Sequence, residues 1–217
     1  MMAAGSKALR RIELAFWVIG LVLIGVALES TFARWNYQQQ QERALFDGGP
    51  APSPTKVAVA TPVRAAAPVA EVSQVTKRKS VRHVPAPDPL AIGRIEIPRL
   101  GLKAIVKQGD DEKTLARAVG LIPGSSFPGE PGNIVLAGHR DTFFWPLQDI
   151  QVGDQIRFVS PRRTYSYSVQ SVHVVNPDDT SVLASHGVEN LTLVTCYPFR
   201  YVGPAPERFI VSATRVN

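Results

Sequence analysis

Three residues that could carry out acyl transfer lie at the ends of predicted strands in the C-terminal half of the chain. Cys196 is the only cysteine among 217 residues and ends a β-tolerant run at 190–196, before Pro198 removes a backbone donor. His139 follows the apolar run 134–137 and lies 57 residues before Cys196. Arg208 directly precedes the apolar run 209–211. A side chain at a strand end can leave a packed sheet and face a cleft.

This combination of a thiol, an imidazole and a guanidinium predicts a nucleophilic cysteine. A thiol with a pKa of about 8.5 needs a base beside it, and His139 could accept its proton and return it during acyl transfer. Arg208 could stabilise the oxyanion or orient a carbonyl. Structural interpretations stay open, because Cys196 could be a small buried hydrophobe and Arg208 could pair with Glu207.

The single cysteine excludes an intrachain disulfide, and there is no paired C-x-x-C spacing of the kind found in zinc sites. A zinc site built on cysteine pairs is therefore not expected; no cofactor is predicted, and the family resemblance described below requires no metal ion.

The N-terminal segment predicts a membrane anchor. Lys7, Arg10 and Arg11 precede residues 14–28, which carry no charge, and residues 29–46 have the composition of a helix that extends outward. The positive-inside rule keeps the basic flank in the cytoplasm and places the rest of the chain outside it. We favour a retained, single-pass signal anchor; a cleaved signal peptide is the alternative.

The composition divides the chain into three parts: an anchor at 1–47, a Pro/Ala-rich linker at 48–89 and a folded domain at 90–217. Lys and Arg outnumber Asp and Glu by six to two in the linker, but only by thirteen to twelve in the folded domain. The net charge of +6 therefore resides mainly in the linker. A nucleic-acid-binding protein usually carries its basic patch on the folded domain, so this function is disfavoured.

The folded domain has the pattern of a mainly β protein with short helices. Its short apolar runs, separated by turn residues, predict about seven or eight strands in a closed barrel or a sandwich. Strands are expected at 92–97, 102–106, 133–137, 155–159, 165–175, 191–195 and 209–213. Asp111 or Asp110 could cap a short helix through Leu115 and Val119, and Asp141 with Thr142 could cap one helical turn.

The same residues closely resemble a known family. The run 191–196 (L-T-L-V-T-C), the upstream run 137–140 (A-G-H-R) and the downstream run 208–211 (R-F-I-V) are similar to the sortases, and most like class D. Sortases are membrane-anchored cysteine transpeptidases. The resemblance covers residues 90–217. Arg200 competes with Arg208 as the family's arginine, but it lies in the loop that follows the cysteine.

The resemblance implies a closed eight-stranded sortase-type β-barrel, preceded by the membrane helix. It also implies that Cys196 attacks an LPxTG-like C-terminal sorting signal after threonine, with His139 as acid and base and Arg208 as substrate or oxyanion ligand. An amine on a cell-wall precursor or a protein would resolve the thioester. Thr195 would position the cysteine.

Three alternatives remain open. Asp141 could orient His139, although pairing with Arg140 is favoured. Asp110, Asp111 and Glu112 could form a calcium site, since some sortases use one, but a solvated turn is favoured. The rival function is a membrane-tethered, non-catalytic β-domain that binds envelope partners.

Overall fold

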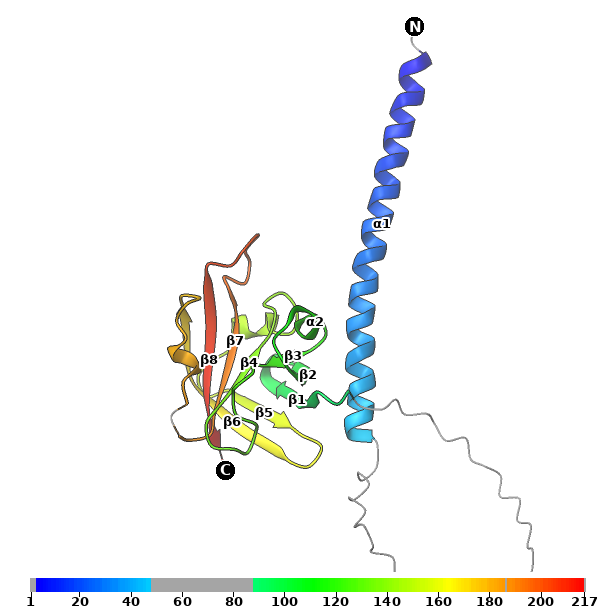
Figure 1. The fold of residues 1–217 in the computed structure, drawn as a ribbon. Coiled ribbons are helices and arrows are strands. Elements are labelled where there is room, and N and C mark those ends of the chain that lie inside the picture. The colour runs from blue at the N-terminus through cyan, green and yellow to red at the C-terminus, as the bar shows by residue number, and fades with distance from the viewer. Residues whose placement is uncertain (1–2, 48–87, 186, 217) are drawn as a thin grey trace, which may run out of the picture.

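The computed structural model contains a long N-terminal helix beside a closed β-barrel (Figure 1). It describes residues 3–47, 88–185 and 187–216. The predicted linker at 48–89 lies outside the described residues except for its last two positions.

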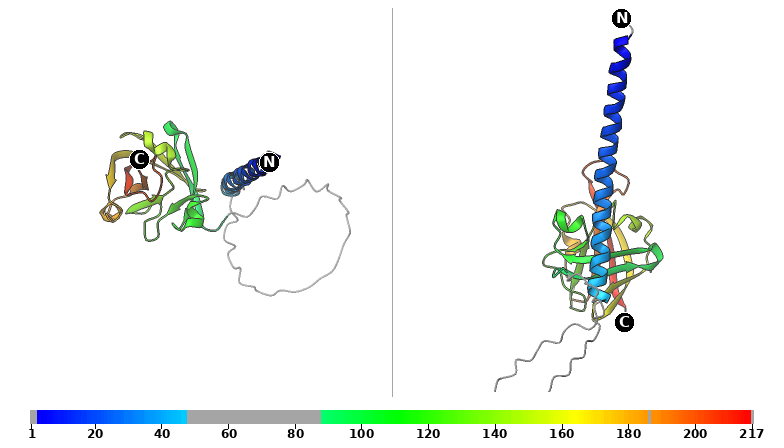
Figure 2. Two further views of the ribbon diagram at one scale, coloured as in Figure 1. Left: turned by 90° about the horizontal axis from the view of Figure 1, so that it is seen from above. Right: turned by 90° about the vertical axis from the view of Figure 1, so that its right-hand side faces the viewer.

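The predicted anchor and its extension form one continuous helix. Helix α1 spans Ala3–Glu42 and continues as the short π-helix η1, Arg43–Asp47. Its segment Glu13–Phe46 is long and apolar enough to cross a membrane, with a mean hydropathy of 2.0 in its most apolar window. The large apolar side chains from Leu14 to Leu28 are exposed along its surface. Figure 2 shows that this part of the helix stands clear of the barrel.

Eight strands close into the barrel in the order β1-β2-β3-β4-β7-β8-β6-β5, which confirms the expected fold class. The strands are β1 (Ala91–Ile97), β2 (Leu102–Gln108), β3 (Val119–Leu121), β4 (Asn133–Ala137), β5 (Gln155–Val159), β6 (Thr164–Val175), β7 (Asn190–Tyr197) and β8 (Glu207–Val216). The short helices are η2 (Pro98–Leu100), α2 (Glu112–Leu115), η3 (Trp145–Asp149) and η4 (Ser181–Leu183).

Two of the expected helical features differ in the structure. Asp111 caps α2 by accepting the N–H groups of Lys113 and Thr114, but the helix ends at Leu115 and Val119 begins β3. Residues 119–121 are extended and not helical because β3 pairs in parallel with β2, and buried Gly120 packs closely against the backbone of Gly109. After β4 the chain forms turns at residues 140–144 and then η3, whose N-cap residue Phe144 makes no side-chain cap, so the predicted Asp141–Thr142 cap is wrong.

Alternation along the strands separates an inner and an outer face of the barrel. On β7 the side chains of Leu191, Leu193 and Thr195 are buried, and on β8 those of Phe209, Val211 and Ala213 are buried. These residues contribute to one apolar core that all eight strands enclose. The intervening residues of both strands therefore lie on the outer face, where Thr192 and Ile210 are still buried under other parts of the chain and Cys196 is partly exposed.

Candidate active site

The parallel pairing of β4 with β7 places the backbone of His139 near that of Cys196. Each residue of β4 pairs with the β7 residue 57 positions later, from Asn133 with Asn190 to Ala137 with Val194. The Gly138 N–H continues this pairing beyond the strand by donating to the carbonyl of Val194 at 3.2 Å. His139 and Cys196 are also separated by 57 residues, so the imidazole follows β4 at the level of the cysteine.

Thr195 ties the two strand ends together. Its hydroxyl donates to the carbonyl of Gly138 at 2.7 Å, and its side chain is buried inside the barrel. Because neighbouring residues on a strand face opposite ways, this inward bond leaves Cys196 facing outward. Cys196 is partly exposed and carries a free thiol. The bond therefore fixes the backbone on both sides of the site.

Arg208 enters from the other neighbour of β7. It is the direct antiparallel partner of Cys196, and residues opposite each other in such a pair project from the same face. Its Nη1 donates to the carbonyls of Glu207 at 3.0 Å and Ala205 at 3.3 Å. The guanidinium is thus held at the base of the loop that joins β7 to β8.

An aromatic cluster packs behind this end of β7. The Tyr197 ring stacks on Phe209 with centroids 6.0 Å apart, and Phe199 meets Phe209 edge-on at 5.1 Å. Trp145, from the segment that follows His139, meets Phe199 edge-on at 6.5 Å. Rigid aromatic packing of this kind connects the histidine segment with the cysteine segment.

The arginines around the site have separate roles. Arg140 donates to the carbonyls of Pro198 and Tyr201 at 2.9 Å and of Gly203 at 3.3 Å, so it braces the loop at residues 198–206. Arg200 is exposed and lies over the Trp145 ring at 5.8 Å. Asp141 is exposed, and no hydrogen bond or ion pair joins it to His139 or Arg140 in the described part of the chain.

Sequence reasoning missed Glu112 as a neighbour of the site. A Glu112 carboxylate oxygen lies 3.8 Å from Nε2 of His139, although the glutamate side chain is 86% exposed. The acidic run 110–112 was noted only as a turn or a calcium site. Asp111 is occupied as the cap of α2, and its hydrogen bonds with Thr114 hold the pKa of its carboxyl below the usual range. Within the described residues, no three His, Cys, Asp or Glu side chains are grouped to hold a metal ion.

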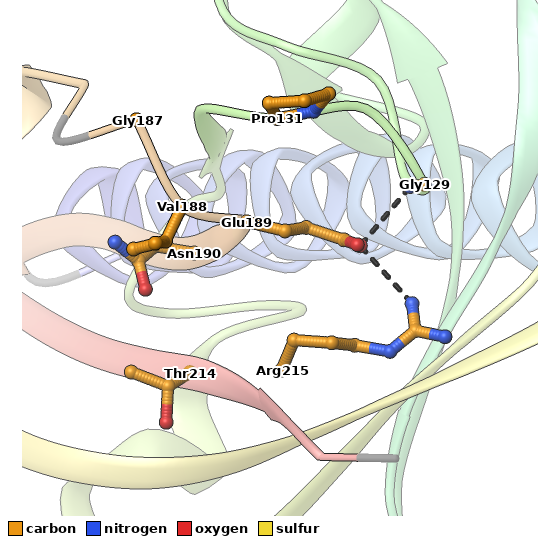
Figure 3. A pocket seen from close by; sticks show the side chains of 8 residues that line it. All are labelled: Gly129, Pro131, Gly187, Val188, Glu189, Asn190, Thr214 and Arg215. Carbon is orange, nitrogen blue, oxygen red and sulfur yellow. Dashed lines mark hydrogen bonds and ion pairs between the residues drawn. The ribbon is translucent and has the colours of Figure 1, made fainter.

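A cavity of about 410 Å³ lies at the opposite end of β7, beside Glu189 and Asn190 (Figure 3). Its charged groups are already paired, because one Glu189 oxygen accepts from Gly129 N–H, from Tyr167 and from Arg215. Burial and the nearby Glu189 raise the pKa of Tyr167. This cluster lies at the opposite end of β7 from Cys196.

The outer face beside Cys196 therefore presents a thiol, an imidazole and a guanidinium from three neighbouring strands. A thiol and an imidazole on adjacent strand ends can form a covalent acyl intermediate, and a fixed guanidinium can bind the oxygen that becomes negative.

The comparisons with known proteins show one family and one fold. The family model described as "Sortase domain" matches residues 95–216. Sortase D of Bacillus subtilis (strain 168) is 40% identical over 128 residues, and Sortase A of Bacillus anthracis is 31% identical over 130 residues. A solved structure of a Clostridium perfringens Sortase D5 transpeptidase has a TM-score of 0.54 and 28% identity, and the match covers 58% of this chain and 79% of that one.

The matched region is the barrel. Each of the two Bacillus relatives aligns with 58% of this chain, and the alignments span 65% and 60% of the lengths of those relatives. The likeness therefore covers less than two thirds of the length of each of these two relatives.

Proposed function

The chain belongs to the sortase family, whose members are transpeptidases, and from that membership we propose that it is a membrane-anchored cysteine transpeptidase acting on an LPxTG-like sorting signal. The observation that carries the proposal is the register of three neighbouring strands. His139 follows β4 beside Cys196, and Arg208 lies opposite Cys196 on β8.

In the proposed reaction, the Cys196 thiolate attacks the carbonyl carbon of the threonine in the sorting signal. The C–N bond breaks when His139 gives its proton to the leaving amine, and a thioester remains on the sulfur. An incoming amine then loses its proton to His139 and attacks the thioester, which returns the thiolate. Arg208 binds the substrate carbonyl or the oxyanion during both steps. The amine belongs to a cell-wall precursor or to another protein.

An apolar strip beside the thiol suits an extended peptide. Ala137 and Val194 are register partners that lie two residues before His139 and Cys196, and both are partly exposed. Alternation places them on the same outer face as the thiol and the imidazole. A leucine or proline of the sorting signal could rest there, so that the scissile bond reaches Cys196.

The proposed location is a cell membrane, with a single pass through α1 and the barrel outside the cytoplasm. The apolar surface of α1 and the basic flank at Lys7, Arg10 and Arg11 support this topology. A thiol outside the cytoplasm that has no disulfide partner fits a nucleophile better than a structural cysteine.

The test is turnover of a fluorogenic LPxTG-like peptide with an amine acceptor, using the full-length chain in detergent. We expect Cys196→Ala and His139→Ala each to lower turnover on the order of a thousandfold or more, with unchanged circular dichroism. His173→Ala is the matched control, because His173 is exposed on β6 and should leave turnover unchanged. A thioester on Cys196 should be visible by mass spectrometry.

Two results would contradict the proposal. Undiminished turnover in Cys196→Ala would exclude the thioester mechanism. A wild-type protein that binds envelope components but cleaves no sorting peptide would instead favour the non-catalytic, membrane-tethered β-domain.

A further inference from the structure

The last turns of α1 are docked on the barrel through polar contacts. The side chain of Gln38 accepts from the Ile105 N–H and donates to the carbonyl of Arg117, both at 2.7 Å. Gln41 is buried and accepts the N–H of Asp88 at 2.7 Å, while Glu42 pairs with Arg94 at 2.8 Å.

The position of Gln38 has a structural cause. Strand β3 has three residues and pairs with β2 only from Val106 onward, so the N–H of Ile105 faces a seam that β3 does not cover. A buried N–H without a partner is costly, and the Gln38 amide fills this gap. Helix α1 therefore completes the barrel at this seam, and its direction relative to the barrel is fixed.

The contacts show which end of the barrel faces the apolar part of α1. Glu42, near the C-terminal end of the helix, contacts Arg94 of β1. Further toward the N-terminus, the guanidinium of Arg34 lies over the Phe143 ring at 5.9 Å. Phe143 belongs to the segment that directly follows His139. The candidate active site thus lies on the side of the barrel that faces the apolar half of α1.

The height of this site along the helix can be estimated from the helical rise. Arg34 comes six residues after Leu28, the last residue of the uncharged run, which is about 9 Å along the axis. The head-group layer on each side of a bilayer is about 5–8 Å thick. Residues 14–28 rise only about 22 Å, less than a hydrocarbon core of about 30 Å, so the edge of the core lies some way past Leu28 and a site at the level of Arg34 lies close to the head-group layer.

The loop between β7 and β8 extends beyond that level. Figure 1 shows this loop rising from the top of the barrel in the direction in which α1 runs toward its N-terminus, with a gap between the loop and the helix. Its tip carries Arg200, Tyr201 and Val202; Val202 is 99% exposed and Tyr201 is 47% exposed. The three carbonyl contacts of Arg140 hold the loop in this upright form.

We infer that this tip, residues 200–202, contacts the lipid head groups of the membrane that α1 crosses. A fully exposed valine, an interfacial tyrosine and a cation match the chemistry of a bilayer surface that contains anionic lipids. The inference rests on the proposed anchoring by α1. This loop contact would hold the thiol close to the membrane surface, where a substrate segment that enters or leaves the bilayer is within reach.

The test places a fluorescent dye at one of two valines in the full-length Cys196→Ala chain. Val202→Cys labels the loop tip, and Val188→Cys is the matched control, since Val188 is 61% exposed just before the opposite end of β7. Each labelled protein is reconstituted into phosphatidylcholine vesicles that contain phosphatidylglycerol and head-group nitroxide lipids. We expect the dye at position 202 to lose about half of its fluorescence and the dye at position 188 to remain nearly unquenched.

Equal, weak quenching at both positions would overturn the inference. Vesicle flotation provides the test of the anchor, and a protein that does not float with the vesicles would overturn the inference as well. The peptide assay on the wild-type chain in the same vesicles separates this result from the proposed function. If the peptide is turned over but the dye at position 202 is not quenched, only the loop contact is contradicted. If the dye is quenched but the peptide is not turned over, the loop contact is supported and the proposed transpeptidase activity is contradicted.

Discussion

Cys196 and Arg208 are direct partners in the antiparallel pairing of β7 with β8, so a thiol and a guanidinium project from the same face at one end of the barrel. Arg200, the competing arginine, is four residues from the cysteine in sequence but lies over the Trp145 ring. The register therefore favours Arg208 as the residue that assists Cys196.

The first prediction compares these two arginines. Arg208→Lys should lower turnover of the sorting peptide by roughly a hundredfold or more, because lysine lacks the planar fork of donors that can hold a carbonyl or an oxyanion. Arg200→Ala should keep most of the turnover. Steady-state kinetics on the full-length protein would measure both, and the reverse ranking would assign the role to Arg200.

The second prediction concerns the bond between Thr195 and Gly138. Thr195→Val keeps the shape but removes the 2.7 Å bond, so unfolding should cost about 1 kcal/mol less. The shifted strand end should also lower kcat by about tenfold to a hundredfold.

Thr192→Val is the matched control for Thr195→Val. In the wild type, the Thr192 hydroxyl donates to the side-chain oxygen of Asn133 at 2.8 Å. Thr192 is as buried as Thr195 and lies on the same strand, further from Cys196. The Thr192→Val variant should lose a similar amount of stability but keep its kcat. Equal losses of kcat in the two variants would show that Thr195 acts only through stability.

The third prediction concerns Glu112, whose carboxylate lies 3.8 Å from the His139 imidazole. A carboxylate at this distance can form an ion pair with a ring that carries a proton during turnover, but exposed charge pairs are weak. Glu112→Gln should therefore lower kcat by only about two- to fivefold at low ionic strength. The difference from wild type should shrink in high salt. Asp110→Asn, on the same turn, should have no such salt-dependent effect.

The fourth prediction is a pH dependence of stability through Asp154. Arg99 pairs with this carboxylate, which is only 8% exposed and also accepts the Gln151 N–H at 2.8 Å. The Arg99 guanidinium holds the pKa of Asp154 below its usual range. The folded state then binds fewer protons than the unfolded state in acid, so this stabilisation is present above about pH 4 and is lost as the pH falls through the folded pKa.

The measurement is thermal unfolding of wild type and Asp154→Asn across acidic and neutral pH. The wild type should be the more stable protein at neutral pH, and the difference in Tm should shrink below about pH 4. Asp178→Asn, at an exposed turn, should follow the wild type. A difference that stays constant into acid would mean that the pair contributes nothing to the pH dependence.

Local patterns predicted much of the barrel. The strands at 133–137 and 155–159 have the expected bounds, because each is a short apolar or alternating run with clear turn residues around it. Strand β3 was missed because three residues with a central glycine carry no periodic signal. It forms through pairing with β2 and β4, which is a tertiary effect.

The arrangement of the site was less predictable. The order of His139, Cys196 and Arg208 indicated the chemistry, but the parallel register of β4 with β7 depends on strands that are distant in sequence. The approach of Glu112 to His139 depends on how α2 packs. The docking of α1 on the barrel was not expected, since the sequence pattern around Gln38 and Gln41 indicates only the polar surface of an exposed helix.

The parallel pairing of β4 with β7 also bears on how the protein matures. Between these strands the chain must complete η3, β5, β6 and η4 before the two can align. Pairing over such a separation is entropically costly and tends to form late in folding. In the proposed mechanism, an incompletely folded chain would carry Cys196 without His139 beside it, so the proposed nucleophile would gain its base only when the barrel closes.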